Sequence, residues 1–192
     1  QAVMSQWRSK AIDDTYEPGS TFKALVLAAA LEEGVVSESD HFYCSGVKQV
    51  ANWPIRCSKR EGHGDQTLAQ AVANSCNPAF VTMGLKIGTE AYYRYLKSFG
   101  LMETTGIDLP AEAEGIFANE DSFNSNVVSL AAYSFGQTFN VTPLELIRAQ
   151  AATINGGYLY TPYLVEQVLD DEGNILSQHE TTASRRPSGL RK

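Results

Sequence analysis

The sequence predicts an α+β fold that is mainly helical and carries small β hairpins. Residues 24–31 are all apolar and directly follow a helix-start signal. Shorter segments repeat apolar residues at helical spacing, and two segments, 45–56 and 163–177, have the pattern of a turn or hairpin. The chain has 192 residues, 43% hydrophobic and 19% charged, which is enough to bury one ordinary core.

The first predicted helix begins at residues 17–23, Glu-Pro-Gly-Ser-Thr-Phe-Lys. Ser20 and Lys23 are three residues apart and are therefore neighbours on one helical face. The helix start has free N–H groups and a positive dipole end, which would stabilise an oxyanion formed at Ser20. A lysine in a dry pocket loses its proton more easily and can act as a general base. The pair therefore predicts a serine nucleophile activated by a lysine.

The four-residue pattern S-x-x-K is weak evidence alone. A second copy, Ser45 to Lys48, lies in a polar stretch that no apolar helix follows. The purely structural alternative for Ser20 is a helix N-cap beside a lysine that faces solvent.

A second candidate segment, Asn-Ser-Cys-Asn-Pro at residues 74–78, lies between helical patterns at 67–73 and 78–86. Ser75 could pass a proton to a departing amine, and the Asn77 amide could bind a substrate amide through both its donor and its acceptor. The structural alternatives are a turn residue for Ser75 and an N-cap before proline for Asn77. Cys76, between them, is interpreted as a small buried filler.

The remaining patterns predict helices and strands that support the fold and carry no candidate site residue. Residues 90–99 form an apolar helical stripe that ends at Gly100. Thr142 to Glu145 is a capping box with proline at the first helical position. The helix that it starts should run to the Asn-Gly-Gly stop signal at 155–157 and should pack on the helix that follows Ser20. An acidic turn at 170–173 separates the strands of a predicted hairpin.

These motifs together resemble the transpeptidase domain of class B penicillin-binding proteins. The resemblance rests on residues 16–23, 75–80, 136–137, 141–146 and 155–157, which occur in the family's order. It implies a helical half packed on an antiparallel sheet, much of which lies outside this chain. It also implies a D,D-transpeptidase that cross-links peptidoglycan stem peptides through an acyl-Ser20 enzyme and is acylated by β-lactams. Lys23 would be the base, Ser75 a proton relay and Asn77 a substrate ligand, with no metal or cofactor.

One family motif is missing, because the chain contains no K-[ST]-G triplet. We therefore expect residues 1–192 to be part of a longer transpeptidase domain, with a core at about 11–180 and a basic tail or connector at 181–192, and to acylate poorly alone. The resemblance further implies an N-terminal membrane anchor and a place on the extracytoplasmic face of the bacterial membrane. A membrane glycosyltransferase and division or elongation proteins would be partners.

Two other functions of the same fold stay open. A serine β-lactamase would need a group that activates water, and the acidic residues near 112–121 read better as a solvated loop. A β-lactam sensor or an inactive scaffold would keep the fold without turnover. The formal charge of −7 argues against nucleic acid as a partner.

The sequence has three cysteines, and Cys44 and Cys57 flank the predicted hairpin at 45–56. A disulfide between them is the first interpretation, worth about 3 kcal/mol on a loop-entropy model. The alternative is a zinc site made by these two cysteines with His41 and His63.

Overall fold

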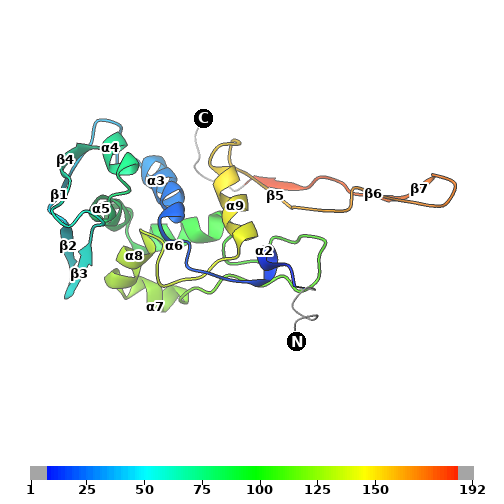
Figure 1. The fold of residues 1–192 in the computed structure, drawn as a ribbon, viewed down its shortest axis with the longest axis horizontal. Helices are drawn as coiled ribbons and strands as arrows, with labels where there is room; N and C mark the ends of the chain where they lie inside the picture. The colour runs from blue at the N-terminus through cyan, green and yellow to red at the C-terminus, as the bar shows by residue number, and fades with distance from the viewer. Residues whose placement is uncertain (1–7, 186–192) are drawn as a thin grey trace.

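The computed structural model describes residues 8–185. A helical body lies between two small β ribbons at one end and an extended β arm at the other (Figure 1). The helical segments are α2 (Lys10–Asp13), the 3₁₀ turn η1 (Gly19–Phe22), α3 (Lys23–Glu32), α4 (Leu68–Ala73), α5 (Asn77–Ile87), α6 (Thr89–Ser98), α7 (Glu120–Asn124), α8 (Val127–Tyr133) and α9 (Pro143–Ala152).

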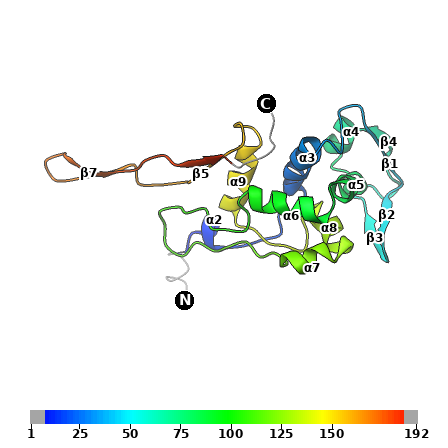
Figure 2. The ribbon, with the colours of Figure 1, turned by 180° about the vertical axis from the view of Figure 1, so that it is seen from behind.

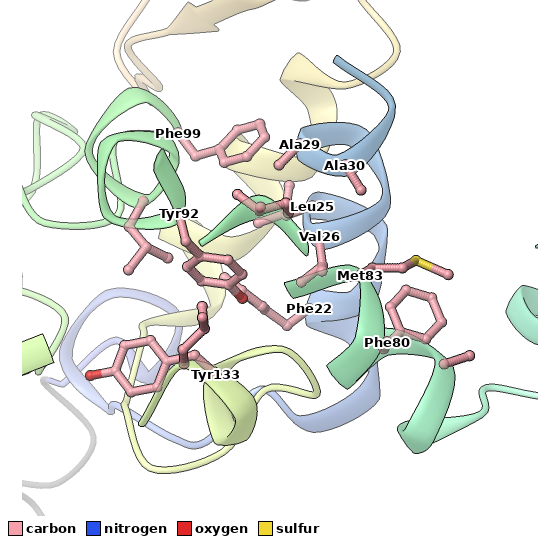
Figure 3. Close-up of a cluster of buried hydrophobic side chains, with 14 of the residues drawn as sticks. Phe22, Leu25, Val26, Ala29, Ala30, Phe80, Met83, Tyr92, Phe99 and Tyr133 are labelled. Carbon is pink, nitrogen blue, oxygen red and sulfur yellow. The ribbon is translucent and has the colours of Figure 1, made fainter. Parts of the chain in front are cut away.

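Helix α3 is the centre of the core. It packs against α5 and α9, and Leu25, Val26 and Ala30 on it are almost wholly buried. In Figure 3 these side chains face Phe80 of α5 and Tyr92 of α6. Burying a leucine or phenylalanine side chain contributes about 2 kcal/mol. The apolar run therefore anchors the helix whose first turn carries Ser20 and Lys23.

Two antiparallel ribbons fold against α5. Strand β1 (His41–Cys44) pairs with β4 (Gly64–Thr67), and β2 (Val47–Val50) pairs with β3 (Trp53–Arg56) between them in sequence. The hairpin predicted at 45–56 is confirmed. This hairpin is inserted in the sequence between the paired strands β1 and β4. The end of β1, the end of β3 and the start of β4 therefore lie close together.

The β arm extends away from the body (Figure 2). Strands β6 (Gln167–Leu169) and β7 (Ile175–Gln178) form the predicted hairpin around the turn at 170–173. Strand β5 (Tyr158–Tyr160) pairs with β8 (Ala183–Arg185). Residues 183–185 are thus a paired strand instead of the expected connector, and the rest of the basic tail lies outside the described residues.

Helices α6 and α9 form where the sequence patterns at 90–99 and after Thr142 predict helices. The capping box is formed, with Thr142 and Glu145 bonding each other's backbone N–H groups. Glu145 is buried and also accepts a hydrogen bond from the Gly115 backbone N–H at 2.9 Å, so it ties the preceding loop to α9. The helix ends at Ala152, three residues before the expected stop signal, because the chain turns at residues 153–157 to enter β5.

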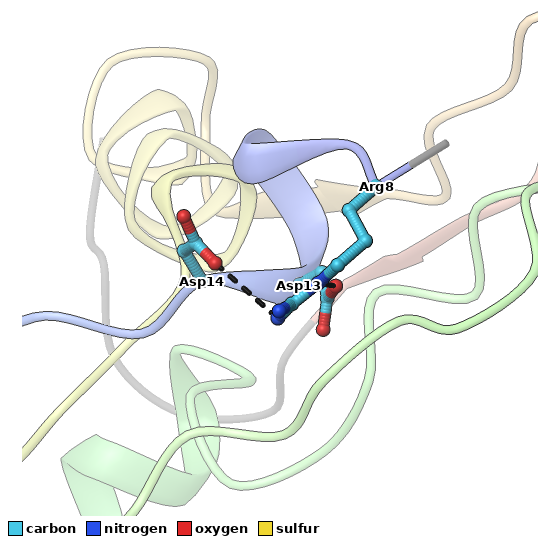
Figure 4. Close-up of polar contacts among 3 residues, drawn as sticks. All are labelled: Arg8, Asp13 and Asp14. Atoms are coloured by element: carbon cyan, nitrogen blue, oxygen red, sulfur yellow. Dashed lines mark hydrogen bonds and ion pairs between the residues drawn. The ribbon is translucent and has the colours of Figure 1, made fainter. Parts of the chain in front are cut away.

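At the other end of the described chain, Arg8 contacts Asp13 and Asp14 beside α2 (Figure 4). These ion pairs are exposed to solvent, which screens them, so they contribute little to stability. Among the described residues, no helix has the length and apolar character needed to cross a bilayer.

Candidate active site

Ser20 lies in η1, directly before α3, and the chain leading to it is fixed by a distant segment. Tyr16 and Val141 exchange backbone hydrogen bonds of 3.0 Å, and the Gly19 N–H donates to the Gly136 carbonyl at 2.8 Å. Gly136 has φ +79°, and a Cβ there would lie 2.0 Å from the Gly19 oxygen. Only glycine allows this close approach. The Gly136 motif therefore supports the backbone that presents Ser20.

Lys23 links the two candidate motifs. Its Nζ lies 3.1 Å from Ser20 Oγ and donates to Ser75 Oγ at 2.8 Å, to the Ser75 carbonyl at 2.8 Å and to Asn77 Oδ1 at 2.7 Å. The residue is only 4% exposed, and its ammonium lies 5.3 Å from the centre of the Phe80 ring. A lysine that faces solvent, the structural alternative, is therefore wrong.

The electrostatic setting favours a neutral amine. Burial lowers the pKa of Lys23 from 10.5 to about 8, although nearby Cys57 and Cys76 act in the opposite direction. A neutral Lys23 would be present at slightly alkaline pH, with a lone pair able to accept the proton of a hydroxyl.

Ser75 ends helix α4 in a Schellman motif. The Ser75 N–H donates to the Val72 carbonyl at 2.9 Å, and the Cys76 N–H donates to the Ala71 carbonyl at 3.0 Å. The motif needs a left-handed residue, usually glycine, and Ser75 occupies it with φ +48°. This backbone turns both the carbonyl and the hydroxyl of Ser75 toward Lys23.

Asn77 is the first residue of α5, and Cys76 precedes it as the N-cap residue. The N-cap interpretation of Asn77 is therefore wrong. Its Oδ1 accepts from Lys23, and its Nδ2 donates to the Arg56 carbonyl at 3.0 Å. The amide is thus oriented from both ends, and Arg56 is a positioning residue that the sequence did not reveal.

Ser20 and Asn77 line an open cleft of about 470 Å³. Its other lining residues come from the start of η1, from β3 and from the segment after α8, and they are Gly19, Pro54, Ile55, Arg56, Phe135 and Gln137. An extended peptide could enter this cleft and place a carbonyl carbon beside Ser20 Oγ. The arrangement of serine, lysine, second serine and amide is suited to acyl transfer.

The second S-x-x-K copy has no such surroundings. Ser45 is exposed and its hydroxyl donates to the Val47 carbonyl, while Lys48 lies on strand β2. The two side chains therefore do not share a helical face. Of the two copies, the first is the one whose lysine contacts its serine.

The cysteine prediction needs correction. Cys44 and Cys57 are both buried free thiols, so the structure does not contain the predicted disulfide. Their sulfur atoms belong to a cluster with His63 and Cys76, whose ligand atoms all lie within 4.8 Å of one another. Cys76 is thus not isolated. The zinc alternative named Cys44, Cys57 and His63 of this cluster, but it included His41 in place of Cys76. His41 instead contacts the exposed Asp65 on β4.

Comparisons with known proteins agree with this geometry. The family model for the penicillin binding protein transpeptidase domain matches residues 1–189. Stage V sporulation protein D of Bacillus subtilis is 45% identical over 164 residues, which cover 85% of this chain and 25% of that protein. The chain thus spans about a quarter of the length of this curated relative.

Two solved structures have the same fold. The D,D-transpeptidase domain of a peptidoglycan glycosyltransferase from Eggerthella lenta has a TM-score of 0.87 at 26% identity, covering 98% of this chain and 51% of that one. Penicillin-binding protein A of M. tuberculosis, solved as a ceftriaxone acyl-enzyme complex, has a TM-score of 0.78 at 26% identity, covering 92% and 40%.

Proposed function

Because this chain belongs to the penicillin-binding protein transpeptidase family, we propose that it supplies the acylating centre of a peptidoglycan D,D-transpeptidase. The observation that carries the proposal is the contact of one buried lysine, Lys23, with Ser20, Ser75 and Asn77. This constellation gives a nucleophile, a base, a proton relay and a substrate amide ligand, and the nucleophile and the amide ligand line one cleft.

In the proposed first step, Ser20 Oγ attacks the penultimate D-alanine carbonyl of a stem peptide as neutral Lys23 takes the hydroxyl proton. The tetrahedral oxyanion forms near the N-terminal end of α3, where the helix dipole favours negative charge. Collapse breaks the peptide C–N bond. The proton passes from Lys23 through Ser75 Oγ to the departing D-alanine amine, and Ser20 carries the acyl group.

In the second step, an amine of a neighbouring stem peptide attacks the Ser20 ester. The amine proton returns through the same groups to Ser20 Oγ, and a cross-link forms. Asn77 holds the substrate amide throughout. A β-lactam offers a strained amide to the same serine, and the leaving amine stays attached to the acyl group, so the adduct would be long-lived.

The cellular setting follows from this substrate class. Peptidoglycan is built outside the cytoplasm, so we place the protein on the extracytoplasmic face of the bacterial membrane, held there by an anchor outside this chain. A membrane glycosyltransferase and division or elongation proteins are the partners that we propose for the whole protein.

The test uses the protein at its natural length with a penicillin and reads the intact mass. We expect one stable penicilloyl adduct in the parent protein and in Ser45→Ala, the matched control from the second S-x-x-K copy. Ser20→Ala should form none. Equal labelling of Ser20→Ala would overturn the assignment of the nucleophile.

The same assay separates the other functions of this fold. Rapid return to the unmodified mass with consumption of the drug would indicate a β-lactamase. A stable adduct in a protein that cannot join stem peptides would indicate a sensor. An absence of both adduct and drug consumption would indicate a scaffold.

A further inference from the structure

Four side chains that could bind a metal ion lie close together behind the loop that carries Ser75. They come from separate segments between residues 44 and 76. Cys44 ends β1, Cys57 follows β3, His63 precedes β4, and Cys76 is the N-cap residue of α5. The three cysteines are buried and His63 is half-buried. None of the four has a role in the acyl transfer proposed above.

The spacing of the ligand atoms matches a tetrahedral metal site. With Zn–S about 2.3 Å and Zn–N about 2.0 Å, a tetrahedron places sulfur and nitrogen ligands about 3.5 Å apart and two sulfurs about 3.8 Å apart. Cys57 Sγ and His63 Nδ1 are 3.5 Å apart, and no pair in the cluster exceeds 4.8 Å. Side-chain movements of about 1 Å or less would complete the tetrahedron.

Backbone geometry holds the ligands in place. The Cys57 N–H donates to the Gly46 carbonyl at 2.8 Å, which joins the end of β3 to the turn after Cys44. A Cβ on Gly62 would lie 2.2 Å from the Cys44 carbonyl oxygen, so glycine permits the close approach of the loop that carries His63.

Polar N–H groups lie close to the sulfur atoms of this cluster. The backbone N–H groups of Lys59 and Asn77 lie beside the Cys57 sulfur. Gln66 is only 2% exposed, its Oε1 accepts from Asn74, and its Nε2 has no hydrogen-bond partner among residues 8–185. The Gln66 side chain also lies beside the Cys76 sulfur. N–H groups beside the ligand atoms commonly hydrogen-bond and orient those ligands in metal sites.

We propose that Cys44, Cys57, His63 and Cys76 bind one Zn²⁺ as a closed structural site. Three thiolates and one imidazole are a soft ligand set that selects zinc, and four protein ligands leave no position for a reacting water. This site replaces the expectation that the chain binds no metal. Because Cys76 lies between Ser75 and Asn77, the ion fixes the loop that presents both groups to Lys23.

The test measures zinc in the protein at its natural length, purified with a reductant, saturated with zinc and freed of unbound metal. We expect His63→Ala to hold one equivalent less than the parent protein by elemental mass spectrometry. His41→Ala and His179→Ala, which remove the other two histidines of this chain, should hold as much as the parent protein. His63→Cys should also keep the ion, because it restores a fourth ligand.

A second measurement keeps the test valid if His63→Ala unfolds. Cobalt added to the reduced, metal-free parent protein should give the thiolate charge-transfer band and strong visible absorption of a tetrahedral site, and zinc should bleach both. The proposal would be overturned if a folded His63→Ala variant held as much zinc as the parent protein. It would also be overturned if cobalt gave no such spectrum. Neither readout depends on acylation, so the site and the proposed function can fail separately.

Discussion

At the scale of one residue, Ser75 adopts a strained backbone conformation within this site. The left-handed conformation at φ +48° costs a residue other than glycine about 1 kcal/mol. A glycine would complete the Schellman motif without that cost, but it would remove the hydroxyl that contacts Lys23. The residue present is the one that the proposed proton transfer requires, not the one that best ends a helix.

We therefore predict opposite effects of Ser75→Gly on stability and on activity. The free energy of unfolding should rise by about 0.5 to 1 kcal/mol, because the strain is relieved. Penicillin acylation should slow by about 10²-fold, because the proton relay is lost. Urea denaturation and intact-mass kinetics measure the two effects. Ser75→Ala is the control, since it should lose activity without gaining stability, and a gain in both variants would contradict the explanation.

The pKa of Lys23 predicts the pH dependence of acylation. In the proposed mechanism the neutral amine is the base, so the acylation rate should rise with pH with a midpoint near 8. The unfolded chain retains the ordinary pKa of 10.5 and so binds more protons between pH 8 and 10.5. The contribution of this residue to folding stability therefore increases with pH through that window. A rate that is flat between pH 6 and about 9 would exclude Lys23 as the titrating base.

At the scale of an element, the start of helix α9 depends on a buried carboxylate. Glu145 is 1% exposed, and its two oxygens accept from the backbone N–H groups of Thr142 and Gly115. Burial raises its pKa, although these N–H groups act against the shift. One side chain thus satisfies both the helix cap and the loop that packs on it.

Glu145→Ala should destabilise the protein by about 2 to 3 kcal/mol, because it removes a cap and leaves two N–H groups without acceptors. Chemical denaturation measures this loss. Glu38→Ala removes an exposed carboxylate and should change stability by less than about 0.5 kcal/mol. Similar losses in the two variants would show that the buried contacts of Glu145 contribute little.

Elements with a signal in their own sequence could be predicted, and contacts between distant elements could not. The capping box of α9, the stripe of α6 and the apolar run of α3 are local patterns, and each formed a helix. Ser20 and Lys23 were found because they share one helical turn. The contact between Cys76 and His63 could not be predicted in this way. It depends on the pairing of β1 with β4 around the β2–β3 hairpin, and neither segment carries a local signal for that pairing.

At the scale of the whole molecule, the β arm leaves apolar side chains in solvent. Leu164, between β5 and β6, is 66% exposed, and Leu176 on β7 is 65% exposed. Within residues 8–185, the two-stranded sheets of this arm have open edges. Exposed strand edges with apolar side chains favour pairing with other chains. In the natural protein we expect further strands of the domain to cover this arm.

We predict that the 192-residue chain alone associates with itself as its concentration rises. Replacing Leu164 and Leu176 by lysine should shift sedimentation toward the monomer, because charge on an exposed ribbon opposes pairing. Leu31→Lys, at a half-exposed leucine on α3, is the control and should associate like the parent chain. An unchanged distribution in the double variant would place the contact elsewhere.

The support of the nucleophile also has a consequence for biosynthesis. The Glu17 carboxylate accepts from the Thr138 N–H, and these partners are separated by 121 positions in the chain. At about 5 to 20 residues per second, a ribosome needs roughly 6 to 24 seconds to make that span. Ser20 therefore leaves the ribosome well before the segment that orients it. A nascent chain stopped before Gly136 should carry both Ser20 and Lys23 and still fail to react with a penicillin.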